Sequence, residues 1–436
     1  MDSPQPSRPR IALRLGLALA LGGAVVVALI GSGAVRLDGR QPAARDPARI
    51  AVIDAEGGFS TLLPDGTEHH IHQVESLAFQ FPAWSPDGTH IASIGHSDAE
   101  SGVFVFDDRA AGAPAQPVAA YRSPQASPIY LYWSPGGGRI AFLTNEPDGL
   151  ALQVVASDGS APAAIVRRGQ PLYWDWIDPS HLFVHSGANT AGAFIGEVAV
   201  DSAEVTAIAV SVGAFQAPAV SPDGLSRAYV ITGDGRASSV VVERRDGSSR
   251  RELSVAAASA LGWSPTGEHF AFSNSAQPLG LPVGPLHVID TQSGATRRLV
   301  DGPVVAWFWS PDGRTLAVLR IPLPSDGQVA AVRGSAGTRG ELMAQSDPPA
   351  LRLLFVDVET DAIRFGREVR LSDLVLTQFV PFGDQYARSH RVWSPTSDAI
   401  VLPLQDETGV SHITIVPADG SAERRIAEGV AAFWSP

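Results

Sequence analysis

The tripeptide Trp-Ser-Pro recurs along this 436-residue chain, and its spacing constrains the fold more than any other feature. It occurs at Trp84, Trp133, Trp263, Trp309, Trp393 and Trp434. Degenerate copies, Trp176-Ile177-Asp178-Pro179 and Val220-Ser221-Pro222, stand where the repeat would otherwise be missing. Successive copies lie 41 to 49 residues apart, with one longer interval of 84 residues. A period of about 44 residues is that of a four-stranded propeller blade.

Each period contains the same order of local signals. A short aromatic run ends in the tripeptide, and a turn rich in Pro and Gly follows, as at Asp87-Gly88 and Asp312-Gly313. Apolar runs come next, among them 90–95, 139–144 and 315–320. Short apolar runs bounded by Gly, Pro or Asp are typical of strands, so each period is expected to form a four-stranded blade.

The two ends of the repeat region complete each other. The chain stops at 430–436, which reads as a first strand without a second, and the region opens at 49–54, which reads as a second strand without a first. We therefore expect the last strand to complete the first blade and close the ring, which removes open sheet edges. Counting the copies predicts an all-β, eight-bladed β-propeller, with seven blades as the alternative because 173–211 is weakly patterned.

The N-terminal region divides into an Arg-containing tail (1–14), an uncharged stretch (15–35) and a polar linker (36–48) before the repeat region at 49–436. An apolar stretch of this length, at about 1.5 Å per residue, roughly matches the hydrocarbon core of a bilayer. We therefore expect one transmembrane helix over 15–35, with the propeller outside the cytoplasm. The alternative is a cleaved signal peptide and a secreted or periplasmic protein, because Ser32-Gly33-Ala34 offers small residues for cleavage.

The Trp-Ser-Pro-Asp-Gly turn, followed by a strand similar to Ile-Ala-Phe, resembles the TolB-type β-propeller repeat, also called the WD40-like or PD40 repeat. The resemblance covers about residues 49–436. It implies an exported or membrane-tethered interaction module or, in some relatives, the gating domain of enzymes similar to prolyl oligopeptidase. The sequence departs from those relatives because it shows no TolB-type N-terminal α/β domain, no hydrolase domain and no DNA-binding domain before the apolar segment.

Composition excludes several kinds of chemistry. The chain has no cysteine, which excludes disulfides, thiolate metal sites and cysteine nucleophiles. All 32 basic residues are Arg, so a P-loop lysine is absent. A net charge of −13 argues against nucleic acid as a partner, and no Gly-x-Ser-x-Gly elbow is present. The sequence therefore predicts no catalytic residues, no cofactor and no nucleic-acid partner.

Histidines gather in the segment Glu68-His69-His70-Ile71-His72. On a strand, His70 and His72 face one side, and two imidazoles at this spacing can bind a transition metal if a third ligand comes from elsewhere. The strand is expected to be the outermost of its blade, where polar residues are normal. A solvated edge is the preferred interpretation, so no metal is predicted and these two histidines remain weak metal candidates.

Strand reversal places three long connections, 274–285, 321–350 and 371–390, on one rim, opposite the tripeptide turns. Loops longer than about 12–15 residues in a compact domain are often functional. The third connection concentrates aromatic and Arg side chains, which suit a binding surface. The candidate binding residues are Phe379, Phe382, Tyr386, Arg388 and His390. The alternative is that this connection packs onto the ring.

The preferred function is that of a non-catalytic, membrane-tethered scaffold outside the cytoplasm, a monomer that binds protein partners or a ligand. The alternatives are an enzyme that acts on glycans through the central channel and a sensor of a metal or ligand. The channel separates these classes, because an enzyme needs convergent carboxylates, His or Arg in a pocket there. A scaffold needs an apolar patch on the rim instead.

Overall fold

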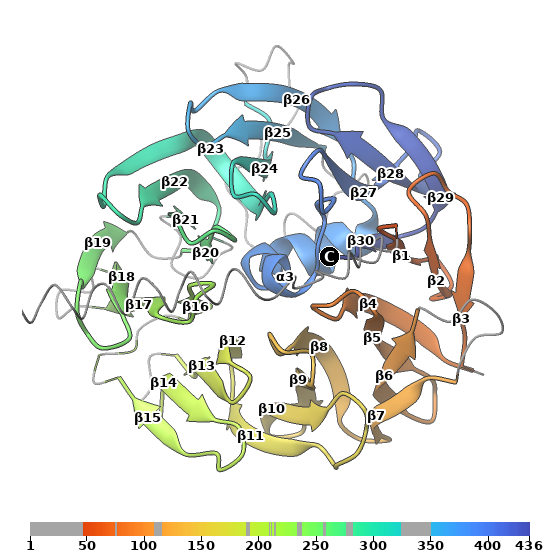
Figure 1. Ribbon diagram of the computed structural model, residues 1–436, viewed down its shortest axis with the longest axis horizontal. Helices are drawn as coiled ribbons and strands as arrows, with labels where there is room; N and C mark the ends of the chain where they lie inside the picture. Colours follow the sequence, from red (N-terminus) through yellow and green to blue (C-terminus); the bar gives the residue numbers. More distant parts are fainter. Residues whose placement is uncertain are drawn as a thin grey trace, which may run out of the picture. The chain divides into compact units, whose positions relative to one another are not determined.

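The computed structural model describes residues 47–74, 76–108, 116–188, 192–208, 210, 212, 215–232, 238–255, 259–275, 282–323 and 350–436. The chain divides into two compact units, Met1–Pro47 and Ala48–Pro436, and the helices and strands below belong to the second. This unit consists of antiparallel sheets arranged around a common centre (Figure 1). Its architecture agrees with the predicted all-β propeller.

Five of the sheets in the described part of the chain contain four strands each. The first is formed by β30 (Ala431–Trp434), β1 (Ile50–Ile53), β2 (Phe59–Leu62) and β3 (His70–His72). The second and third are formed by β4 (Ala78–Trp84), β5 (His90–His96), β6 (Ser101–Asp107) and β7 (Val118–Ser123), and by β8 (Ser127–Trp133), β9 (Arg139–Glu146), β10 (Gly149–Ala156) and β11 (Ala164–Gly169). The fourth and fifth are formed by β12 (Leu172–Asp178), β13 (His181–Ser186), β14 (Phe194–Ala199) and β15 (Val205–Ala207), and by β16 (Ala219–Val220), β17 (Ser226–Thr232), β18 (Ser238–Arg244) and β19 (Arg251–Val255).

Two further sheets contain seven and three strands. The larger is formed by β20 (Leu261–Trp263), β21 (His269–Ser273), β22 (Gly284–Asp290), β23 (Thr296–Trp309), β24 (Thr315–Arg320), β25 (Leu351–Asp357) and β26 (Ile363–Val369). The smaller is formed by β27 (Ala399–Gln405), β28 (Ser411–Pro417) and β29 (Arg424–Glu428), and Trp393 adds an isolated bridge to Ile400. The 14-residue β23 joins two groups of strands, because its first part pairs with β22 and its last part with β24.

The two ends of the repeat region pair with each other, as the sequence predicts. Strand β30 runs antiparallel to β1, with Trp434 opposite Ile50 and Ala431 opposite Ile53. All four of these residues are buried. The pairing therefore closes the first sheet with the last strand of the chain.

The serine of each tripeptide fixes the turn that follows it. In the first copy, the Ser85 hydroxyl donates to the Asp87 carboxylate at 2.6 Å and accepts the backbone N–H of His90 at 3.0 Å. The same 2.6 Å contact recurs between Ser221 and Asp223 and between Ser310 and Asp312. These aspartates are therefore engaged in turn geometry, as is common for Asp at such positions.

Several of the repeat tryptophans connect their own sheet to the one before it through an indole hydrogen bond. The indole N–H of Trp133 donates to the carbonyl oxygen of Ala83 at 2.8 Å, and that of Trp393 to Phe308 at 2.9 Å. Equivalent bonds run from Trp84 to Phe433, from Trp176 to Tyr132 and from Trp309 to Gly262. These five tryptophans thus combine a large ring with a satisfied polar atom at the boundary between sheets, whereas the indole N–H groups of Trp263 and Trp434 have no acceptor among the described residues.

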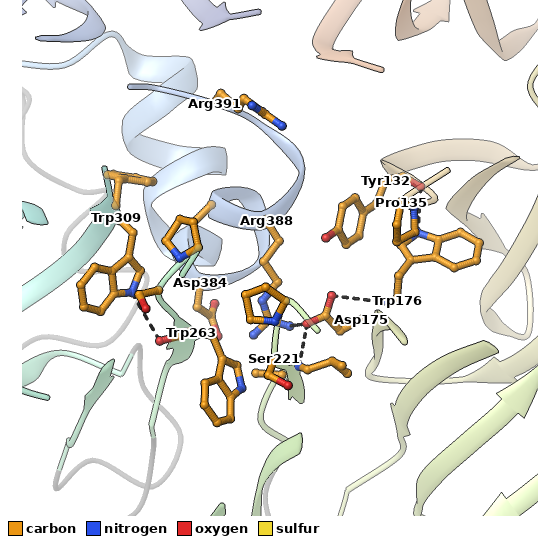
Figure 2. Close-up of a pocket in the computed structure, with 18 of the residues that line it drawn as sticks. Tyr132, Pro135, Asp175, Trp176, Ser221, Trp263, Trp309, Asp384, Arg388 and Arg391 are labelled. Atoms are coloured by element: carbon orange, nitrogen blue, oxygen red, sulfur yellow. Dashed lines mark hydrogen bonds and ion pairs between the residues drawn. The ribbon is translucent and has the colours of Figure 1, made fainter. Parts of the chain in front are cut away.

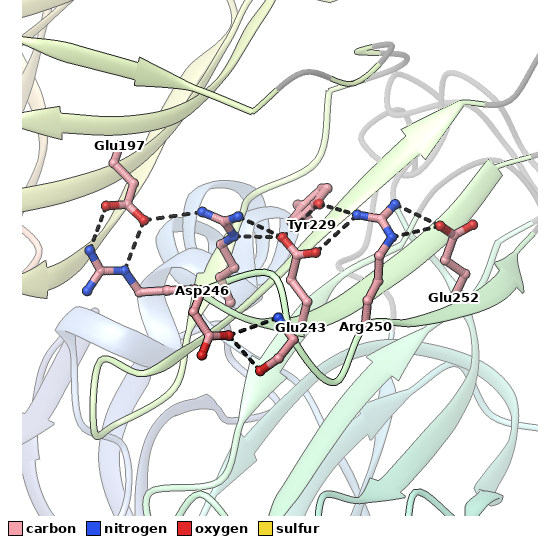
Figure 3. A network of polar contacts seen from close by, with 9 residues as sticks. Glu197, Tyr229, Glu243, Asp246, Arg250 and Glu252 are labelled. Atoms are coloured by element: carbon pink, nitrogen blue, oxygen red, sulfur yellow. Dashed lines mark hydrogen bonds and ion pairs between the residues drawn. The ribbon is translucent and has the colours of Figure 1, made fainter.

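The boundary between the sheets β12–β15 and β16–β19 lacks this indole bond, because Val220 stands in the tryptophan position. Ion pairs cross it instead (Figure 3). Glu197 of β14 lies 2.6 Å from the guanidinium of Arg245 and 3.2 Å from that of Arg227. Arg227 continues the network to the buried Glu243 at 2.7 Å. The network therefore connects the two sheets where the sequence repeat is degenerate.

Between β26 and β27 the chain leaves the ring wall and enters its centre. Residues 371–390, here called the central insert, contain the π-helix η2 (Val375–Phe379), the 3-10 helix η3 (Val380–Phe382) and the α-helix α3 (Gly383–Ser389). Figure 1 shows α3 in the middle of the ring. Gly383 permits this close approach, because a Cβ atom there would lie 2.9 Å from the Cβ atom of Ala306 in β23.

The position of the insert corrects the expectation that 371–390 is a loop on the rim. Its apolar residues, among them Val375 and Val380, are buried against the inner faces of the ring. Packing onto the ring, the alternative interpretation, is what the structure shows. Of the other two expected loops, 276–281 and 324–349 lie outside the described residues.

The predicted membrane location is also corrected. Among the described residues, no helix is long and apolar enough to cross a bilayer. The α-helix α3 has seven residues, about 10 Å at 1.5 Å per residue, against a hydrocarbon core of about 30 Å. This finding contradicts the prediction of a single-pass membrane protein with its propeller outside the cytoplasm. The segment 15–35, on which that prediction was based, lies outside the described residues, together with 1–14 and 36–46.

Candidate functional site

A pocket of about 690 Å³ lies among the tripeptide turns and is here called the central pocket (Figure 2). Prolines from six turns line it: Pro135, Pro179, Pro222, Pro265, Pro311 and Pro395. The central insert supplies Asp384, Ala387 and Arg388, and Arg391 follows directly after it. The pocket therefore combines the repeated wall of the ring with the single-copy segment in its centre.

Arg388 anchors the central insert to the wall. Its guanidinium lies 3.2 Å from the carboxylate of Asp175, donates to the carbonyl oxygen of Leu261 at 2.9 Å and also donates to that of Pro218. Burial raises the pKa of Asp175, and Arg388 partly opposes that rise. Burial lowers the pKa of Arg388, but the carboxylate of Asp175 outweighs it, so that pKa is raised. The pair is mutually neutralised and connects α3 to three sheets.

Asp384 is one of the carboxyl groups that line the pocket. It lies in the first turn of α3 and is half-buried. Burial raises its pKa to about 6, although Arg388 and the backbone N–H groups of Gln385 and Leu261 favour the ionised form. The carboxyl group therefore changes charge close to neutral pH, which is a property shared by many functional carboxyl groups.

Arg391 is the second arginine that lines the central pocket. Its side chain is exposed, and among the described residues no carboxylate or carbonyl group pairs with its guanidinium. Its backbone carbonyl accepts the N–H of Trp434 at 2.7 Å, which fixes the start of the side chain. The surrounding protein lowers the pKa of Arg391 through burial, and Tyr132 partly opposes this effect. Figure 2 shows its side chain apart from the joined Arg388 and Asp175.

The aromatic residues expected to bind a partner lie inside the ring. Phe379 is 2% exposed, Tyr386 5% and His390 2%, whereas Phe382 is half-buried against the core. Tyr386 packs on Phe379, with ring centroids 4.8 Å apart. A side chain this buried meets a partner only if the insert moves. A binding role for Phe379, Phe382, Tyr386, Arg388 and His390 stays a prediction, and the structure brings Arg388 and His390 to the central pocket.

A chain of hydrogen bonds holds the end of the insert. Tyr130 donates to the Ser389 hydroxyl at 2.8 Å, and this hydroxyl lies 2.7 Å from Nδ1 of His390. Nε2 of His390 lies 3.0 Å from the carbonyl oxygen of Phe81, which only accepts, so Nε2 carries the proton and Nδ1 accepts from Ser389. Burial lowers the pKa of His390 to about 4, although the Phe81 carbonyl favours the charged form. His390 is therefore a neutral structural residue at pH 7.

His70 and His72 face the same side of β3, as expected, and both contact Asp108. Nε2 of His72 lies 3.0 Å and Nδ1 of His70 lies 3.3 Å from the same carboxylate oxygen. Arg49 lies 3.0 Å from the other oxygen, and Thr61 donates to the first at 2.6 Å. His72 is 5% exposed, so it is not a solvated edge residue. Among the described residues no group of His, Asp and Glu is arranged to hold a metal ion.

Asp175 and Arg391 are not among the site residues predicted from the sequence, although both depart from the pattern of the repeat. The residue before the repeat tryptophan is apolar or glycine in other copies, as in Ala83, Tyr132, Gly262, Phe308 and Val392. Asp175 occupies that position before Trp176, so an acid interrupts an apolar register. Comparing the copies column by column finds this acid, and it finds Arg391 two residues before Trp393.

Comparison with known proteins supports the fold. No protein-family model matches the chain, and no curated protein matches it. A eukaryotic initiation factor has a TM-score of 0.52 at 11% identity, covering 90% of this chain and 99% of its own. Dihydro-heme d1 dehydrogenase NirN has a TM-score of 0.50 at 14% identity, covering 88% and 74%. Putative TolB from Agrobacterium tumefaciens is 21% identical over 61% of this chain and 95% of its own, with a TM-score of 0.38. At these identities the similarity concerns the β-propeller fold alone.

Proposed function

We propose that this chain is a non-catalytic binding module that takes a ligand into the central pocket. The observation that carries the proposal is the pocket itself, about 690 Å³ within the ring and lined by both wall and insert. Binding sites for small molecules commonly measure about 300–1,000 Å³ and are mostly apolar with a few polar groups. Trp263, Trp309 and the turn prolines supply the apolar lining, and Arg391 and Asp384 supply polar groups.

The proposal includes a ring of eight blades. The seven-stranded sheet divides into two groups of four strands if β23 is counted in both. The three-stranded sheet gains a fourth, innermost contact from Trp393 through its bridge to Ile400. With the five four-stranded sheets, this arrangement supports eight blades over the alternative of seven, and it places one tripeptide copy or its degenerate form in each blade.

The non-catalytic part of the proposal rests on how the polar groups of the pocket are engaged. Asp175 pairs with Arg388, Ser221 donates to Asp223, and His390 is buried and neutral. A nucleophile needs a free base within hydrogen-bond reach, and none of these groups offers that arrangement. Each contact instead holds the insert or a turn in place.

The test compares how well the protein retains a ligand when the pocket is open and when it is blocked. The full-length protein is incubated with a small-molecule extract of its source cells, separated by gel filtration, denatured, and the released compounds are identified by mass spectrometry. Ala387→Trp, at an exposed position of α3 that lines the pocket, should place an indole ring in the pocket and block retention. Ala164→Trp, on the exposed face of β11, is the matched control and should retain the same compounds. Equal retention by both variants, at unchanged melting temperature, would refute the proposed site.

A second candidate function, an enzyme acting on glycans through the channel, is favoured by Asp384. A carboxyl group with a pKa of about 6 can serve as a general acid near neutral pH. In that case Asp384→Asn would retain ligand binding and lose turnover of the captured compound. A binding module predicts that the captured compound is recovered unchanged from both the wild type and this variant.

A further inference from the structure

From the unpaired guanidinium of Arg391, we infer that the ligand of the central pocket is a small organic anion. It would carry a carboxylate, sulfonate or phosphate group bound to Arg391 and a planar or apolar body against the tryptophan wall. The inference rests on the proposed function and specifies its ligand class. The contrast with Arg388, three residues earlier in the chain, supports it. Arg388 is satisfied by Asp175, Leu261 and Pro218, whereas no described group satisfies Arg391.

The guanidinium of Arg391 is suited to an anion for two physical reasons. The side chain is exposed, but the surrounding protein removes part of the hydration of its guanidinium, and a carboxylate or phosphate can form charge-assisted, two-pronged hydrogen bonds with it. The backbone at the base of this side chain is also fixed, because the carbonyl of Arg391 accepts the N–H of Trp434 and the next residue, Val392, is buried. Ligand binding therefore does not have to order the backbone at this position.

The other charges of the pocket leave room for an anion. Arg388 pairs with Asp175 and favours the ionised form of Asp384, although burial raises the pKa of both carboxyl groups. The other two carboxylates of the lining, Asp178 and Asp223, accept hydrogen bonds within their own turns. The protein as a whole carries a net charge of −13 and does not attract anions through its overall field. Anion binding to this chain would therefore be local, and removal of one arginine should abolish most of it.

The apolar residues of the pocket indicate the shape of the rest of the ligand. Trp263 and Trp309 are half-buried, so part of each ring faces the pocket, and Ala387 is exposed beside them. Indole rings stack on planar groups and on the apolar faces of cyclic compounds. The insert occupies the ring centre, so the pocket favours a compact ligand over an extended chain threaded through the ring.

The experiment uses a matched pair of fluorescent probes and the full-length protein. The first probe is 8-anilinonaphthalene-1-sulfonate, and the second is N-phenyl-1-naphthylamine, which has the same rings without the sulfonate. Arg391→Gln should weaken binding of the sulfonate by at least ten-fold, about 1.4 kcal/mol, and change binding of the neutral probe by less than about two-fold. Arg425→Gln, an exposed arginine of β29, is the matched control and should behave as wild type.

Two further variants make the outcome decisive. Arg391→Lys keeps the charge and loses the planar fork, so its affinity for the sulfonate should lie between those of wild type and Arg391→Gln. Ala387→Trp should abolish binding of both probes. If Arg391→Gln binds the sulfonate as wild type does while Ala387→Trp abolishes both probes, the anion inference is wrong and the proposed pocket stands. If Ala387→Trp binds both probes normally, or wild type binds neither, the inference and the proposed use of the pocket both fail.

Discussion

The ring wall and the central insert are built on different principles. The wall repeats one design, in which a tryptophan bonds to the preceding sheet and a serine fixes the next turn, as at Trp133 and Ser85. The insert at 371–390 occurs once and combines three short helical segments of different types. The repeat therefore forms the ring, and the single insert determines how much space remains at its centre.

The first prediction concerns two wall tryptophans in the same tripeptide context. Trp393 is 3% exposed and donates to Phe308, whereas Trp263 is half-buried and its indole N–H has no acceptor among the described residues. Trp393→Ala should therefore lower the free energy of unfolding by about 3–5 kcal/mol, and Trp263→Ala by at least about 1 kcal/mol less. Urea denaturation measures both. Equal losses would mean that the indole bond to the preceding sheet has no part in the wall.

The second prediction separates the two arginines at the insert. Arg388→Ala leaves the buried carboxylate of Asp175 without its partner, so it should lower the free energy of unfolding by roughly 3 kcal/mol. Arg391→Ala removes an exposed, unpaired group and should change it by less than about 0.5 kcal/mol. The same denaturation assay compares the pair. A large loss for Arg391→Ala would show that this side chain is structural and would weaken the case for a ligand.

The third prediction is a smaller effect that depends on pH. The carboxyl of Asp384 has a pKa of about 6 in the folded protein and an ordinary value of 3.8. Between these values the folded state binds more protons than the unfolded state, so this group lowers stability as pH rises from about 4 to 6. Asp384→Asn cannot ionise. Its stability relative to wild type should therefore increase by about 1–2 kcal/mol from pH 4 to pH 7.

Asp178 provides the control of opposite sign. Burial is the largest single influence on Asp178 and opposes its ionisation, but hydrogen bonds from Ser180 and His181 together outweigh it and lower the pKa. Asp178→Asn should therefore be less stable than wild type at neutral pH, and this difference in the free energy of unfolding should shrink as pH falls. The exposure of Asp178 makes the change small. A pH-independent difference between Asp384→Asn and wild type would contradict the burial assigned to Asp384.

The sequence predicts the wall well because each blade repeats local signals. The unpaired strands predicted at 430–436 and 49–54 indicate their pairing, and the tripeptides indicate the tight turns that follow them. The insert was harder to predict, because its helical segments are shorter than the two or three turns that give a recognisable period. The sequence predicts Phe379 and Tyr386 as binding residues, but clustered aromatics have the same composition whether they face a partner or a core. Only the contacts of Phe379 with the ring decide between these environments.

The central insert fills the ring and leaves one face of α3 open to the central pocket. The chain contains no cysteine, so single cysteines can report this directly. The two test variants are Ala387→Cys and Ser389→Cys. Ala387 is exposed in the pocket, whereas Ser389, two residues away, is buried and bonded to Tyr130. The account predicts that a maleimide labels the first in the native protein at least about a hundred times faster than the second, with equal rates after denaturation. Equal rates in the native protein would contradict the packed insert and, with it, the pocket that rests on α3.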